Sequence, residues 1–165
     1  MKICSSLEKI INEQINHEMA SSYVYLAMHA WLETTPYKGF SRWMLEQSKE
    51  ETGHAMRFLD YLLDRQGTVH LMPLAEPRKT YKSPLEVFET SLKQEQQITG
   101  LIHKIYALAE KEKDYETRHF LSWFLQEQVE EEKSTGDMVD ALRLAGDHIN
   151  ALMRLDAKAG ARGGS

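Results

Sequence analysis

The sequence predicts an all-α fold, a bundle of four long helices with a short fifth helix at its C-terminal end. Two observations carry this prediction. The 165-residue chain contains only four prolines, and none of them lies inside a long stretch with helical spacing of apolar residues. Strand signals are poor, because alternation of apolar and polar residues is rare and no Asn-Gly or Asp-Gly pair occurs. Four long helical segments are typical of a helical bundle.

The first two predicted helices cover about residues 5–33 and 40–66. The stretch TTPYKG, residues 34–39, separates them, and Gly67 ends the second helix. Because the connection is short, we expect the two helices to be antiparallel neighbours. Apolar residues recur at every third or fourth position of the first helix, at Leu7, Ile11, Ile15, Met19, Tyr23 and Leu26.

The third predicted helix follows a long connecting stretch, residues 68–84, and extends to about residue 112. Ser83, Pro84 and Glu86 form a predicted capping box at its start. A connection of about 16 residues spans roughly 50 Å when extended, whereas a 27-residue helix is roughly 40 Å long. The connection can therefore cross the whole bundle, which would make the second and third helices parallel.

Two further helices are predicted in the C-terminal part. The fourth covers about residues 115–145 and ends at Gly146, and the short fifth helix covers about residues 148–157. We expect one domain over residues 1–158, followed by a flexible tail at residues 159–165.

The composition excludes several classes of function. The formal net charge is −5, the pI is near 5.8 and no basic cluster occurs, so neither nucleic acid nor an anionic membrane is expected as a main partner. The single cysteine, Cys4, excludes an internal disulfide and any site that needs four cysteines. The N-terminus lacks the apolar region of a signal peptide, and no run of 18 apolar residues occurs. We expect a cytoplasmic protein.

Each of the four long helices has an acidic residue in the stripe that should face the core. In the second helix, the stripe that includes Trp43 and Phe58 also contains Glu51 and His54. The predicted directions of the helices bring the acids to about one level of the bundle. The acids of the other three helices are Glu18, Glu95 and Glu131.

Four carboxylates at one buried level need a compensating charge. A single glutamate in such a stripe usually reaches water, but an unpaired buried carboxylate is costly and clustered carboxylates repel one another. The stripes offer no arginine or lysine near these acids. A metal ion is the simplest compensating charge, and oxygen donors with one nitrogen suit iron or manganese. Glu51 and His54, three residues apart, can bind one ion together, and Glu51 can bridge to a second.

At these positions the chain resembles the ferritins, and most closely the bacterial non-haem ferritins. The resemblance covers about residues 5–146. It implies an iron-storage protein with ferroxidase activity, in which an intrasubunit di-iron centre oxidises Fe(II) with O₂ or H₂O₂ and a hollow homo-24-mer shell stores ferric mineral. The stretches that carry the resemblance are NEQINHEMASSYVY (12–25), EETGH (50–54), KQEQQIT (93–99) and FLSWFLQEQVEEEK (120–133).

The resemblance also implies a role for individual residues. Glu18, Glu51 and His54 would bind the first iron ion, Glu51 would bridge, and Glu95 and Glu131 would bind the second ion. Each of these residues stands inside a stretch that matches the family pattern.

Two further residues would lie beside the iron pair. Gln128 would hydrogen-bond bound dioxygen or water, and Tyr25 would be a candidate electron donor. Plain core packing is the simpler explanation for Tyr25 and for Trp123, which lies in the same matching region as Gln128.

Members of the family also often have a third iron site on the cavity side. The matching residues are Glu50, Glu127 and Glu130, which would share Glu131. Glu50, Glu127 and Glu130 are explained equally well as parts of an exposed acidic helix face.

The chain departs from two related families. The fourth helix contains Gln128-x-x-Glu131 where bacterioferritins and rubrerythrin-like proteins have a second ExxH motif. Thr52 stands where bacterioferritins have a haem-ligating methionine, so no haem is expected. Gly53, inside the second helix, lowers helix propensity by about 1 kcal/mol relative to alanine.

Two other classes of function remain open at this point. One is a di-iron oxidoreductase or peroxidase of the rubrerythrin–bacterioferritin type, which retains its metals and forms a small oligomer. The other is a non-catalytic helical bundle or shell whose carboxylates are protonated or bind a structural cation. The sequence also leaves the choice between O₂ and H₂O₂ open.

Overall fold

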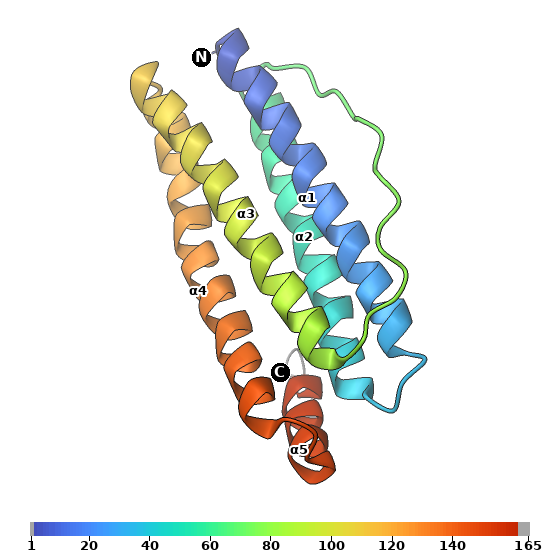
Figure 1. Ribbon diagram of the computed structural model, residues 1–165. Helices are drawn as coiled ribbons and strands as arrows, with labels where there is room; N and C mark the ends of the chain where they lie inside the picture. Colours follow the sequence, from blue (N-terminus) through green and yellow to red (C-terminus); the bar gives the residue numbers. More distant parts are fainter. Residues whose placement is uncertain (1, 162–165) are drawn as a thin grey trace.

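The structure is a computed structural model that describes residues 2–161, which form five helices and contain no strand. Four long helices lie side by side as a bundle, and the fifth packs at one end (Figure 1). The fold class expected from the sequence is confirmed. The helices are α1 (Ser5–Leu32), α2 (Lys38–Asp64), α3 (Pro84–Lys111), α4 (Tyr115–Ala145) and α5 (Ile149–Gly160).

The C-terminal helix is longer than expected. Helix α5 extends to Gly160, past the expected domain boundary at residue 158. Residues 162–165 of the expected tail lie outside the described residues. Over the residues that are described, none of the helices combines the length and the apolar character that a membrane span requires.

The long connection between α2 and α3 runs beside α1 along the length of the bundle (Figure 1). Its first part is fixed to α1 by Asn12, whose side-chain amide donates to the Thr68 carbonyl oxygen (2.9 Å) and whose Oδ1 accepts from the His70 N–H (2.6 Å). Helices α2 and α3 are therefore parallel, while α1–α2 and α3–α4 are antiparallel pairs (Figure 1). This is the connectivity expected from the loop lengths.

The helix ends follow local chemistry, with one difference from expectation. The Ser83 hydroxyl accepts from the Glu86 N–H at the start of α3 (3.2 Å), as in a capping box. The Glu86 carboxylate, however, accepts from the Lys82 N–H (2.6 Å) and so completes the box one residue earlier. Helix α4 ends at Gly146, whose φ of +52° favours glycine.

Helix α5 makes a close contact with the start of α2. A Cβ atom on Gly39 would lie 1.7 Å from the Asp156 carbonyl oxygen, so this approach requires glycine. The buried Asp156 carboxylate accepts from the Phe40 N–H (2.8 Å). Because Tyr37 provides no side-chain cap, α5 supplies the acceptor that the first turn of α2 lacks.

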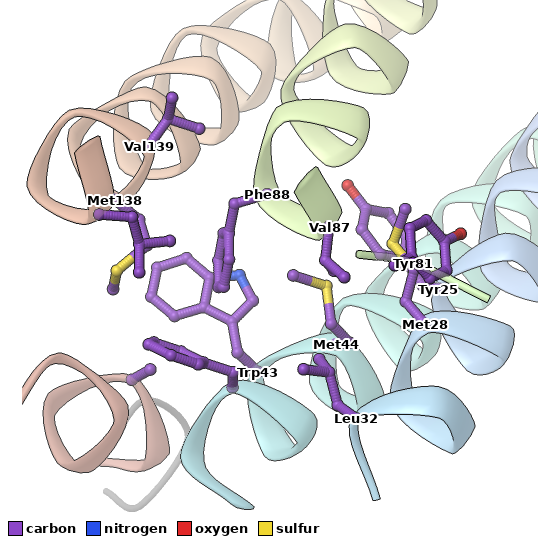
Figure 2. Packing of buried hydrophobic residues seen from close by; sticks show 13 residues of the cluster. Tyr25, Met28, Leu32, Trp43, Met44, Tyr81, Val87, Phe88, Met138 and Val139 are labelled. Atoms are coloured by element: carbon purple, nitrogen blue, oxygen red, sulfur yellow. The ribbon is translucent and has the colours of Figure 1, made fainter. Parts of the chain in front are cut away.

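The core consists of two apolar clusters at opposite ends of the bundle. Side chains of all four long helices meet in the first cluster, where the rings of Trp43 and Phe88 pack edge to face, 5.5 Å between centroids (Figure 2). The second cluster contains Ile11, Phe58 and Phe124. Between the clusters, each long helix has buried polar side chains in place of apolar ones.

The buried face of α1 shows this change directly. Tyr23 and Leu26, which continue the apolar spacing of the sequence, are 45% and 43% exposed. Glu18 and Tyr25 are fully buried instead. The core-facing stripe that contains Glu18 is therefore the inward face of α1, and the apolar residues Tyr23 and Leu26 of the second half lie outside it.

Candidate metal centre

A layer of buried polar side chains crosses the middle of the bundle. It contains one acid from each long helix, and His54 lies one turn after the acid of α2. The structure therefore brings all five predicted di-iron ligands into one layer. Their exposed fractions are 0% for Glu18, 1% for Glu51, 5% for His54, 0% for Glu95 and 3% for Glu131.

Glu18, Glu51 and His54 form the closest group of ligand atoms. One ligand atom of each residue lies within 4.8 Å of the others. The Nδ1 atom of His54 is 3.4 Å from Oε2 of Glu51. Glu18 Oε2 and both carboxylate oxygens of Glu51 accept no hydrogen bond from an amide, imidazole or alcohol donor among the described residues. Buried acceptors without donors are rare, and a cation is the partner that this donor set fits.

Glu95 and Glu131 lie on α3 and α4, next to this group. The Tyr25 hydroxyl donates to one oxygen of Glu95, and Nε2 of Gln128 donates to the other (3.2 Å). Nε2 of Gln47 donates to Oε2 of Glu131 (2.9 Å). Within residues 2–161, these two acids do not join the close group.

Burial raises the pKa of the carboxyl groups in the layer. Desolvation raises the pKa of Glu18 and of Glu51 well above the ordinary value, and repulsion from Glu51 and Glu95, respectively, adds to it. The pKa of Glu95 rises to about 7, first because of desolvation. A raised pKa favours the protonated form of these groups, so a cation that binds their ionised form would displace protons.

A family model for the ferritin-like domain matches residues 8–145 of the chain. The chain belongs to the ferritin family. It is 36% identical over 160 residues to the bacterial non-heme ferritin of Staphylococcus haemolyticus, covering 97% of this chain and 96% of the relative. It is 39% identical over 152 residues to that of Staphylococcus saprophyticus, covering 92% of this chain and 91% of the relative. Membership supports iron storage with ferroxidase-type activity in general terms.

Solved structures show the same relationship. The open pore ferritin from the hyperthermophilic archaeon Archaeoglobus fulgidus matches with a TM-score of 0.96 at 40% identity, covering 98% of this chain and 99% of that chain. A humanized archaeal ferritin matches with a TM-score of 0.96 at 39% identity, covering 98% of each chain.

In this ferritin, Tyr25 belongs both to the first apolar cluster and to the polar layer. Its ring is fully buried in the cluster. Its hydroxyl donates to Glu95 and lies 2.9 Å from the Ser91 hydroxyl. Burial raises the pKa of Tyr25, so the phenol keeps its proton at neutral pH. Core packing alone therefore does not account for Tyr25.

Core packing does not account for Trp123 either. This side chain is 39% exposed at the surface of α4. Its ring lies edge-on to the His54 ring, 5.5 Å between centroids, and the Arg57 guanidinium lies over it at 3.8 Å. Trp123 thus covers the outer side of the histidine.

The residues of the predicted third iron site lie at the surface beside the polar layer. Glu50 and Glu130 are exposed, and Glu127 is half-buried, which raises its pKa through desolvation. No close group of ligand atoms forms from these three in the described part of the chain. The third site stays a prediction.

Two buried glutamines of this ferritin were not predicted from the sequence. Gln14 and Gln47 are 1% and 0% exposed, and each lies one turn before the acid of its own helix. Nε2 of Gln14 donates to Oε1 of Glu18 (2.7 Å), and Gln47 bonds to Glu131 as described. The signal was present in the sequence, because both glutamines occupy core-facing positions four residues before an acid.

Proposed function

We propose that this ferritin oxidises Fe(II) to Fe(III) at a di-iron centre within each subunit and stores the product as ferric mineral inside a shell of its own copies. The observation that carries the proposal is the buried cluster of carboxylates and one imidazole at the centre of the bundle. Glu18, Glu51 and His54 bind the first iron ion. Glu51 bridges to the second, which Glu95 and Glu131 bind.

The donor set suits oxidation of iron. Hard anionic oxygen ligands stabilise Fe(III) more than Fe(II), so they lower the reduction potential of the bound pair. Each Fe(II) ion gives up one electron. An O₂ molecule that takes both electrons and two protons leaves as H₂O₂, and an H₂O₂ molecule that takes the same leaves as two water molecules. Gln128, whose amide donates to Glu95, would hydrogen-bond the oxidant or water in this proposal.

One histidine among four carboxylates also suits a site that passes its iron on. Fe(III) formed there moves to the interior and is hydrolysed to mineral. Storage needs a container, and we propose the homo-24-mer shell that the family resemblance implies. Large apolar side chains on the isolated subunit support burial against further copies, including Leu71 (76% exposed), Leu144 (88%) and Ile149 (73%). The cytoplasmic location stays a prediction.

The test is anaerobic loading of the purified protein with Fe(II), first at two ions per subunit and then in large excess, followed by air. Absorbance reports oxidation, and particle size reports assembly. We expect fast oxidation at the low ratio and continued soluble uptake at the high ratio. Glu51→Ala should slow the fast phase by at least about 100-fold, since even residues that only support metal ligands are worth about 10-fold to 100-fold.

Glu46→Ala is the matched control for Glu51→Ala. It removes an acid of the same helix that pairs with Lys49 at the surface. We expect wild-type oxidation from this variant. An unchanged rate in Glu51→Ala would contradict the site assignment.

Two other outcomes would favour other functions. Oxidation that stops at two ions per subunit in a small oligomer would indicate a di-iron oxidoreductase that retains its metals. A rate no higher than that of buffer would indicate that the carboxylates have a structural role only.

A further inference from the structure

Neutral amide groups, and no lysine or arginine, donate to the carboxylates whose contacts are described in the polar layer. Gln14 donates to Glu18, and Gln128 donates to Glu95. Gln47 donates across the bundle from α2 to Glu131 on α4. Three different acids of the layer thus each accept a bond from a glutamine. All three glutamines are at least 97% buried, with exposed fractions of 1% for Gln14, 0% for Gln47 and 3% for Gln128.

An amide is the donor that a metal-binding carboxylate needs. An arginine or lysine at the same place would neutralise the carboxylate and compete with the incoming ion. An apolar side chain would leave the carboxylate free to rotate. A glutamine N–H fixes one oxygen and leaves the negative charge in place.

Glu18 shows this division between its two oxygens. Oε1 accepts from Gln14 at 2.7 Å. Oε2 is buried and accepts no hydrogen bond from an amide, imidazole or alcohol donor among the described residues, and it faces the Glu51 carboxyl, so it stays available as a ligand atom. The bond to Gln14 thereby sets which oxygen of Glu18 can reach the ion.

Gln47 has an unused group of its own. While its Nε2 donates to Glu131, its Oε1 is buried without a hydrogen-bond donor among the described residues. A buried amide oxygen without a donor costs free energy. Water bound to an incoming ion can supply that donor, because water in a metal's coordination shell is a strong hydrogen-bond donor.

We infer that Gln14 and Gln47 are positioning residues with separate targets: Gln14 orients Glu18 for the first iron ion, and Gln47 orients Glu131 for the second. This inference rests on the proposed function, since it assumes that both ions bind in the layer. It assigns a different consequence to the loss of each glutamine: weaker binding of the first ion without Gln14, and weaker binding of the second ion without Gln47. If the glutamines only supported the fold, loss of either one would weaken the binding of both ions equally.

The test is calorimetric titration of the assembled, metal-free protein with Zn(II), which has the charge of Fe(II) and cannot be oxidised. Gln47→Leu should weaken the second binding step by about 10-fold to 100-fold and leave the first unchanged. Gln14→Leu should weaken the first step by a similar factor and leave the second unchanged. Glu18→Gln and Glu131→Gln identify the two steps, because each removes the carboxylate charge that one ion needs.

Two controls keep the result interpretable. Gln97→Leu changes an exposed glutamine of α3 and should bind Zn(II) like the wild type. Gln47→Met and Gln14→Met keep the length of the side chain without a donor, so they replace any leucine variant that does not fold. Chemical unfolding of each metal-free variant shows whether the fold is intact.

The outcomes separate the inference from the function on which it rests. Wild-type protein that binds no Zn(II) in the layer would overturn both. Wild-type protein that binds two ions, with both glutamine variants binding them equally well, would overturn the inference alone. Equal weakening of both steps in each variant, together with lower unfolding stability, would also overturn it.

Discussion

The middle of the bundle and one of its ends both bury charged side chains, but they balance the charge differently. At the end, Arg65 and Asp114 form a paired contact, with Nη1–Oδ1 at 3.0 Å and Nη2–Oδ2 at 2.8 Å. Their side chains are only 9% and 11% exposed, and the arginine lowers the pKa of Asp114 to about 2. In the middle, burial raises the pKa of Glu18, Glu51 and Glu95 instead.

This difference shows that the fold supplies an arginine where a carboxylate serves structure. Asp114 also caps α4 by accepting from the Thr117 N–H (2.9 Å), so its charge holds two elements in place. In the middle layer, Glu18 and Glu95 accept hydrogen bonds from the neutral amides of Gln14 and Gln128. In the proposed function, a cation from outside the chain supplies the charge that balances these carboxylates.

The largest expected change in stability comes from removing the Arg65–Asp114 pair. Asp114→Ala should lower the free energy of unfolding by about 3–5 kcal/mol, because it removes the carboxylate that balances the charge of the buried Arg65 guanidinium. It also removes the cap of α4. Chemical unfolding at pH 7 measures the loss. Asp114→Asn keeps a capping oxygen and should lose less, and iron oxidation by the folded fraction should be unchanged in both. A slower oxidation rate would show that the two regions are not independent.

The two regions should also respond to pH in opposite directions. The pKa of Glu95 is about 7 when folded and near 4.5 when unfolded, so its contribution to stability is complete below pH 4.5 and is lost as the pH rises through 7. The full effect is on the order of 3 kcal/mol. Asp114, with its pKa lowered from 3.8 to about 2, contributes above pH 3.8 and loses its effect as the pH falls toward 2.

Chemical unfolding of the metal-free protein from pH 2 to 8 separates these effects. Glu95→Gln should flatten the curve between pH 4.5 and 7, and Asp114→Asn should flatten it only at the acid end. If the unfolding free energies of wild type and Glu95→Gln depended on pH in the same way, burial would not raise the pKa of Glu95.

A smaller effect of opposite sign is expected at Glu51. Glu51→Gln removes a buried acid that other carboxyls repel and whose pKa is raised by burial, so the metal-free protein should gain unfolding free energy at pH 7.5. The same variant should lose fast iron oxidation. A less stable metal-free variant would indicate that Glu51 supports the fold, as Asp114 does.

The smallest effect is expected beside the site, at Gly53. A Cβ atom there meets no atom within 4 Å, so packing within the subunit does not require glycine. Gly53→Ala should raise the free energy of unfolding by about 0.5–1 kcal/mol through helix propensity, without changing iron binding. Gly39→Ala is the contrasting control, because its Cβ would clash with the Asp156 carbonyl oxygen at 1.7 Å. Weaker Zn(II) binding by Gly53→Ala would link this glycine to the position of His54.

Much of the fold could be predicted from the sequence, because helix periodicity and end signals are local. The acids of the polar layer were found for the same reason: an acid in a core-facing stripe is visible without any partner. The bonds from Gln47 to Glu131 and from Asp156 to Phe40 could not be predicted, since spacing along one helix does not reveal which residue of another helix it meets. The exposure of Tyr23 was missed because apolar residues also occur at protein surfaces.

The most direct test of the central claim is chemical unfolding of the metal-free protein at pH 7, with and without Fe(II), under strict exclusion of oxygen. We predict that Fe(II) raises the unfolding midpoint of the wild type and releases protons, because the ions supply positive charge to the middle layer. Glu51→Ala should lose most of the increase, and Asp114→Ala should keep it. An unchanged midpoint in the wild type would mean that the buried carboxylates need no cation, which would overturn the proposed metal centre.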